Sequence, residues 1–173
     1  MSTNLILRQL LDGDEAAFLE GKAEWEGESP HWHSFSWKEG MSYPEMMQIL
    51  RDEHSGKKLQ PGRVKHSMLY AFLNGKIIGR VSVRHELNEM LRRRGGHIGY
   101  AVAPRFRQKG YARLMVGHAI DFCRELGLKE IMITCGDDNV PSWKIIEHFG
   151  GRLEDKIWDE EDKETIRRYW VTL

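Results

Sequence analysis

The sequence predicts an α/β fold, an α+β sandwich in which helices flank a mixed central sheet. Three observations predict this class. Asn74-Gly75 joins two apolar, strand-like runs, and this dipeptide is the strongest short signal for a β-hairpin. The segment 108–126 places apolar residues at helical spacing. Strand-like and helix-like segments interleave along the chain, which is typical of a sheet covered by helices.

The first half of the chain contains the hairpin and two helices. Asp12 or Asp14 can cap the first helix, because a short acidic side chain accepts from free N–H groups at a helix start. Pro44 suits the first turn of the second helix. The expected elements are, in order, a strand over 5–10, helices over 15–25 and 44–54, and strands over 67–73 and 76–84.

The second half continues the same pattern. Pro104 ends a strand, and Gly127 follows the long amphipathic helix, where glycine commonly ends helices. No repeat, low-complexity segment or linker divides the chain, so we expect a single domain over 1–173. The expected elements are a strand over 96–103, a helix over 108–126, a strand over 130–135, a helix over 141–149, and strands over 152–158 and 165–173.

Composition narrows the class of protein. The 26 Lys and Arg residues balance 26 Asp and Glu residues, whereas nucleic-acid binders usually carry a basic excess. The cluster 92–94 therefore indicates a solvated loop. Cys123 and Cys135 lie in predicted elements, so we expect no disulfide. No signal-peptide pattern or long apolar run occurs. These features predict a cytoplasmic protein with no membrane or nucleic-acid partner.

A basic, glycine-containing turn at the start of the long helix is the clearest chemical feature. Backbone N–H groups at a helix start have no partner within the helix, and the helix dipole adds positive charge there. Such a terminus binds anions. Gly110 permits close approach of a phosphate, and Arg107 and Lys109 add charge. The pattern predicts a diphosphate cradle, although a plain turn would use the same glycine.

This turn resembles the acetyl-CoA signature of the GNAT superfamily, Gln/Arg-x-x-Gly-x-Gly/Ala. The preceding strand 98–104, IGYAVAP, is similar to the family's central strand, whose free backbone groups hold the pantetheine arm and the thioester carbonyl. The resemblance implies acetyl-CoA as co-substrate. It implies that the cofactor-binding residues include Ala101, Val102, Ala103, Arg107, Gln108, Lys109, Gly110, Tyr111 and Ala112.

The resemblance extends to the next helix. The run from Asn139 to Ser142, followed by a short helix and a Phe-Gly-Gly end, is similar to the family's Asn-x-x-Ser/Ala segment. The resemblance implies that both residues contact the cofactor, and both could also cap the helix. Many members carry a tyrosine seven residues after the Asn, where it protonates the leaving thiolate. Ile146 stands there, so the acid is left unassigned.

An attacking amine must be neutral, so a residue of the site or a water molecule must accept its proton. His97 begins the central strand, where histone-acetylating members of the family place a Glu, and histidine titrates near neutral pH. Glu86 is the second candidate and Glu89 the third. A strand-end histidine bonded to a loop, and two solvated carboxylates, are the structural alternatives.

The aromatic segment between the first two helices corresponds in the family to a wall of the acceptor pocket. We therefore expect substrate contacts from Trp32, His33, Phe35, Trp37 and Tyr43, with a satellite hydrophobic cluster as the alternative. His31 and His33 have no Cys or acidic partner at ligand spacing, so no metal is predicted.

The sequence thus predicts an acetyl-CoA-dependent N-acetyltransferase that acts on a primary amine of a small molecule. Two alternatives stay open. One is acetylation of a protein N-terminus or lysine, and the other is a non-catalytic module that senses acyl-CoA. The acceptor, the length of the acyl group and the oligomeric state, including a homodimer, are not determined by the sequence.

Overall fold

A computed structural model describes residues 4–28 and 33–173 of the chain. The strands are β1 (Leu5–Arg8), β2 (His66–Leu73), β3 (Lys76–Arg84), β4 (Ile98–Val102), β5 (Glu130–Gly136), β6 (Arg152–Asp159) and β7 (Glu164–Thr172). The α-helices are α1 (Glu15–Ala23), α2 (Tyr43–Ser55), α3 (Glu89–Arg93), α4 (Tyr111–Glu125) and α5 (Val140–His148). No helix among these described residues is long and apolar enough to cross a membrane.

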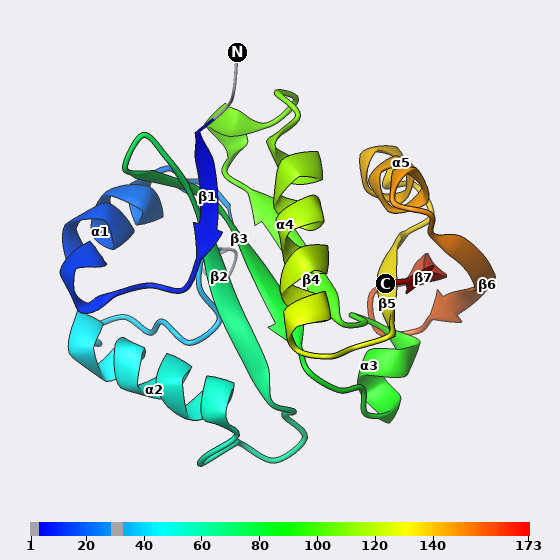
Figure 1. Cartoon of the computed structure of the whole chain (residues 1–173), viewed down its shortest axis with the longest axis horizontal. Coiled ribbons are helices and arrows are strands. Elements are labelled where there is room, and N and C mark those ends of the chain that lie inside the picture. Colours follow the sequence, from blue (N-terminus) through cyan, green and yellow to red (C-terminus); the bar gives the residue numbers. More distant parts are fainter. Residues whose placement is uncertain (1–3, 29–32) are drawn as a thin grey trace.

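The strands form two antiparallel sheets. One has the order β1-β2-β3-β4, and the other has the order β5-β7-β6. In Figure 1, α1 and α2 lie on the left beside the first sheet, while α5 lies on the right with the second. The expected mixed sheet would join β4 to β5 in parallel. Instead the two strands diverge, and this divergence creates the site described below.

The β2–β3 hairpin confirms the strongest local prediction. Asn74 and Gly75 have φ values of 50° and 80°, the left-handed pair that a tight hairpin turn requires. Leu73 pairs with Lys76 directly across this turn. The hairpin therefore fixes which residues of β3 face each side of the sheet.

Side chains of the first sheet alternate between two cores. The larger core lies against α4 and includes Leu69, Val81, Ile98, Met115 and Ile120. The smaller core lies against α1 and α2 and includes Phe18, Met46, Tyr70, Phe72 and Ile77. The sheet therefore separates an α4 face from an α1–α2 face.

Two helix starts show how local chemistry sets element boundaries. Ser42 and Glu45 form a capping box before α2, with Pro44 in its first turn as expected. By contrast, α4 begins at Tyr111, three residues later than predicted. Gln108 and Gly110 have φ values of 61° and 82°, and this left-handed backbone cannot belong to a right-handed helix.

Candidate functional site

The central feature of the site is the gap between β4 and β5. The two strands meet where the His97 N–H donates to the Met132 carbonyl oxygen at 2.7 Å. The Met132 N–H donates in turn to His97 Nδ1 at 2.9 Å. Beyond this point β4 pairs only with β3, and β5 only with β7. His97 therefore joins the two sheets at the closed end of the gap.

The edge of β4 that faces the gap carries free backbone groups. Ala103 N–H donates to Ile78 O of β3 at 2.9 Å, and backbone groups alternate between the two edges of a strand. Tyr100 and Val102 consequently direct their N–H and C=O groups away from β3. The Val102 carbonyl oxygen accepts from Arg107 Nε at 2.9 Å. These groups can bind the amides of an extended ligand.

The start of α4 provides an anion site at the open end of the gap. No side chain caps this helix, so its first N–H groups are free to bind a ligand. A Cβ added at Gly110 would meet nothing within 4 Å. The turn from Arg107 to Gly110 is exposed. The uncapped helix start and the open space at Gly110 therefore lie where the sequence predicts a diphosphate cradle.

The cationic side chains of this turn are engaged within the protein. Arg107 forms an ion pair with Glu28, with Nη2 and Oε2 3.0 Å apart. Lys109 Nζ donates to the Arg105 carbonyl oxygen at 3.0 Å. Tyr111 and Ala112 are half-buried in the first turn of α4. The free N–H groups at this helix start are therefore the main groups available to bind a phosphate. Arg107 could bind a phosphate only after leaving its ion pair with Glu28.

The start of α5 lies across the gap from β4. Asn139 Oδ1 accepts from the Ser142 N–H at 3.3 Å and caps the helix. Ser142 Oγ hydrogen-bonds the Tyr100 hydroxyl at 2.8 Å, so one side-chain contact spans the gap. Trp143 Nε1 is buried and has no hydrogen-bond partner among the described residues.

The position of the family's tyrosine offers no acid. Ile146 is fully buried in the larger core. Burial raises the pKa of the Tyr100 hydroxyl to about 12. A phenol of that pKa is a far weaker acid than a thiol near 8.5, so it would donate a hydrogen bond and keep its proton.

The candidate bases lie toward the closed end of the gap or outside it. His97 is 6% exposed, and its Nδ1 lone pair already accepts from Met132. Burial, followed by the charge of Arg92, lowers the pKa of His97 to about 4. Glu86 and Glu89 are both exposed. The arrangement gives His97 a structural contact that proton transfer would have to break.

Most described aromatic residues of the segment between α1 and α2 pack into the smaller core. His33 is buried, its Nε2 lies 3.1 Å from Phe18 O, and burial lowers its pKa to about 4. Trp37 packs against Phe18 with ring centroids 5.3 Å apart. The Tyr43 hydroxyl donates to Leu11 O. These contacts form the satellite cluster that was the alternative prediction.

Phe35 differs from the rest of this segment, because it lies over the sheet. The Arg80 guanidinium carbon is 3.9 Å from the centre of its ring. Trp32, the remaining expected substrate contact, falls outside the described residues. Phe35 therefore lies against the α1–α2 face of the sheet at Arg80 of β3.

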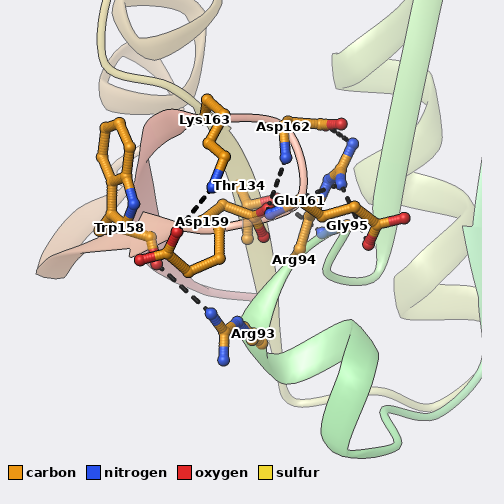
Figure 2. A network of polar contacts seen from close by, with 10 residues as sticks. Arg93, Arg94, Gly95, Thr134, Trp158, Asp159, Glu161, Asp162 and Lys163 are labelled. Carbon is orange, nitrogen blue, oxygen red and sulfur yellow. Dashed lines mark hydrogen bonds and ion pairs between the residues drawn. The ribbon is translucent and has the colours of Figure 1, made fainter.

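A polar network, drawn in Figure 2, braces the closed end of the gap. Arg94 forms an ion pair with Asp162, and Arg93 donates to the Trp158 carbonyl oxygen. The Gly95 N–H donates to Thr134 Oγ1 at 2.9 Å. The arginine cluster, which the sequence predicts to be a solvated loop, thus connects the segment before β4 to the β6–β7 turn. Gly95 connects the same segment to β5.

Comparisons with known proteins show the family of this chain. Residues 29–150 match the Acetyltransferase (GNAT) family. The chain therefore belongs to the GNAT acetyltransferase family, whose members use acetyl-CoA as acyl donor. It is 26% identical over 84 residues to the uncharacterized N-acetyltransferase YnaD of Bacillus subtilis. That match covers 42% of this chain and 49% of YnaD, so it spans about half the length of that relative.

Solved structures show the same fold at low sequence identity. One is the putative acetyltransferase yncA of Salmonella typhimurium with its cofactor acetyl-CoA, with a TM-score of 0.64, 14% identity, and coverage of 98% of this chain and 94% of that one. Another is a chimera of the Vibrio cholerae spermidine N-acetyltransferase SpeG with hSSAT. Its TM-score is 0.62 at 20% identity, covering 97% and 95% of the two chains.

Proposed function

We propose that this chain transfers the acetyl group of acetyl-CoA to a primary amine of a small molecule, by direct attack in a ternary complex. The observation that carries the proposal is the gap between β4 and β5, which leads to the uncapped start of α4. A linear ligand with an anionic end and an amide-containing arm matches these two features. Acetyl-CoA has both.

The residues present fit this cofactor. The N–H groups at Gly110, Tyr111 and Ala112 would hold the diphosphate, because the open space at Gly110 admits it. The free edge of β4 at Tyr100 and Val102 would bind the pantetheine amides. Asn139 caps α5 by accepting from the Ser142 N–H, and Ser142 Oγ hydrogen-bonds Tyr100. These two residues would therefore orient the opposite wall of the gap.

When bound, acetyl-CoA supplies an activated acyl carbon, and the chain must present a neutral amine to it. The amine nitrogen forms the new bond to that carbon, the carbon–sulfur bond breaks, and its electron pair stays on sulfur. Ile146 provides no acid and Tyr100 is too weak an acid, so we assign protonation of the sulfur to water. The protein then contributes mainly by positioning the reactants and excluding competing geometries.

Distance supports water as the acceptor of the amine proton as well. The resemblance implies that the thioester carbonyl lies at Ala101, whose own backbone groups face Arg80 of β3, so the N–H groups that could hold it are those of Tyr100 and Val102. His97 is four residues upstream of Ala101, ~13 Å along a strand at ~3.3 Å per residue. Arg80 pairs with Ala101, and Glu86 follows the end of β3 at Arg84, which is already ~13 Å from Arg80 by the same rise. We therefore propose that neither residue takes the proton directly.

The Glu86→Gln variant tests that assignment. We expect the pH profile of kcat/KM to match the unmodified protein, because the side chain is exposed and far from Ala101. Steady-state thiol release between pH 6 and 9 provides the measurement. A loss of ~10²-fold that shrinks as pH rises, the usual effect of a positioned base, would instead make Glu86 the base.

Acetyl-CoA should stabilise the folded chain. At a hundredfold excess over its dissociation constant, mass action adds ~2.7 kcal/mol to the free energy of unfolding. Calorimetric titration and thermal unfolding with acetyl-CoA and with free CoA measure this effect. Absence of both heat and thermal shift would refute the cofactor assignment.

A non-catalytic sensor is the alternative in which CoA binds but no amine reacts. Trp37 packs against Phe18 within the α1–α2 core, and this placement favours the enzyme. Screening amine, amino-acid and peptide panels for thiol release separates the two. Binding of acetyl-CoA without release from any panel member would support the sensor.

A further inference from the structure

Two arginines occupy the α1–α2 face of the sheet beside the predicted reaction centre. Arg80 pairs directly with Ala101 across β3 and β4. Paired residues have their side chains on the same face, with Cβ atoms ~5 Å apart. Gly99 pairs with Ser82, and Arg84, two residues further along β3, shares that face.

The guanidinium of Arg84 lies directly on β4. Its Nη1 donates to the Gly95 carbonyl oxygen at 3.2 Å. A Cβ added at Gly99 would lie 2.9 Å from the same Nη1 atom. The Arg84 guanidinium can therefore lie against β4 only because Gly99 has no side chain.

The charge of Arg84 is not matched by a carboxylate of the protein. Among residues 4–28 and 33–173, no Asp or Glu forms an ion pair with it. Its surroundings are also positive, since Arg63 and burial both lower its pKa, burial more strongly, to about 10. Arg84 stays charged at neutral pH, and a largely buried charge is stable only with a counter-charge or ample hydrogen bonds.

Arg80 adds to the positive potential of this face. It is 1% exposed, and it lies over Phe35. Burial lowers its pKa to about 10, so it too remains charged. Meanwhile Gly99 and Ala101 are partly exposed, whereas Ile98 and Val102 on the opposite face are buried. A ligand that reaches this stretch of β4 lies beside the partly exposed Arg84, with the buried charge of Arg80 behind it.

We propose that Arg84 binds a carboxylate of the acceptor, and that the acceptor is an amino acid. This inference rests on the proposed acetyl transfer and specifies its substrate class. Gly99 and Ala101 are two residues apart, ~7 Å along the strand. An α-amino acid carries its amine and carboxylate on one carbon, so a carboxylate hydrogen-bonded to Arg84 at ~3 Å places the amine between Gly99 and Ala101, toward Ala101. Arginine suits the role because its planar fork binds carboxylates in a bidentate manner.

The same charges select against polycations. A polyamine such as spermidine would place ammonium groups beside Arg80 and Arg84, and like charges in a partly buried site repel strongly. The chain should therefore differ in acceptor from a spermidine N-acetyltransferase, although it shares that fold.

Matched acceptor pairs test the proposal on the whole chain. Glycine, alanine, methionine, glutamate and phenylalanine are each compared with their methyl esters, which remove the negative charge and also lower the pKa of the amine, so rates are compared per neutral amine. We expect kcat/KM for thiol release to favour the free acids by at least ~10-fold, the range of a charge-assisted hydrogen bond. Aminomethylphosphonate, as a second anionic amine, reports whether the site requires a carboxylate. Faster reaction of the esters or of spermidine would overturn the proposal.

Two variants assign the effect to Arg84. Arg84→Gln should raise KM for the free acid by ~10²-fold, leave the methyl ester unchanged and leave acetyl-CoA binding intact. Arg84→Lys should recover part of the loss. Gly99→Ala is the second route, since it displaces the guanidinium without removing it, and it should also raise KM. Equal changes for acid and ester in both Arg84→Gln and Gly99→Ala would refute the assignment.

A binding measurement separates this inference from the proposed function. Calorimetry with alanine and with its methyl ester, on the chain saturated with CoA, requires no turnover. Binding of alanine that is lost in Arg84→Gln supports the anion site even if no acetyl transfer occurs. Thiol release from neutral or cationic amines, without binding of alanine, would leave the proposed function intact and remove only this inference.

Discussion

Replacing Gly110 by aspartate should weaken CoA binding by ~10²-fold. The variant places a carboxylate at the free N–H groups of α4, where the diphosphate is expected. Two like charges ~4 Å apart repel by ~4 kcal/mol at an effective dielectric constant of 20, and partial relaxation lowers the expected loss to about two thirds of that. Calorimetric titration with CoA measures the affinity directly.

Gly110→Asn is the matched control, because it has nearly the same shape and no charge. Asparagine and aspartate both tolerate the left-handed backbone that Gly110 adopts at φ 82°, so the two variants should unfold alike. Gly127, at the other end of α4, has φ 81° and equally open surroundings. Gly127→Asn therefore reports the cost of the backbone strain alone. Equal CoA affinity in the Asp and Asn variants at 110 would mean that no phosphate binds there.

The cofactor side of the site could be predicted because its signals are local. A glycine turn before an amphipathic helix, and an Asn three residues before a Ser at the next helix start, are patterns within a few residues of sequence. The structure places both patterns at helix N-termini. The hairpin at Asn74 and Gly75 was predictable for the same reason.

The acceptor side could not be predicted because its burial is set by distant residues. Arg80 and Arg84 alternate with valines along β3, which looks like a strand with its polar side in water. Phe35 and the α1–α2 segment cover that side instead. Similarly, the partner of His97 is Met132, 35 residues further along the chain. No pattern near His97 indicates that β5 would turn away from β4 directly after this contact.

His97→Ala should lower the free energy of unfolding by about 2–4 kcal/mol. The substitution leaves the buried Met132 N–H without its acceptor and creates a cavity where the two sheets meet. Chemical denaturation followed by circular dichroism measures the loss. We also expect weaker CoA binding, because this contact fixes where β4 and β5 begin to diverge.

His97→Asn separates a structural role from a catalytic one. Asn Oδ1 stands at nearly the same place as His Nδ1, so it can accept from Met132 but cannot serve as a base near neutral pH. If His97 only joins the sheets, the Asn variant should recover most of the stability and react at the unmodified rate. A rate that stays low in the Asn variant, and recovers as pH rises, would restore His97 as the base.

The Asn variant should also change the response to acid. Burial lowers the pKa of His97 from 6.5 to about 4, so between these values the unfolded chain binds a proton that the folded chain does not. The free energy of unfolding therefore falls as pH drops through this window, by up to ~1.4 kcal/mol per pH unit for each such histidine. His33 and His85 have pKa values lowered to about 4 in the same way, chiefly by burial. The slope of the free energy of unfolding against pH should become smaller in His97→Asn, and part of it should remain because of His33 and His85. An unchanged slope would show that His97 takes up its proton equally in the folded and unfolded chains.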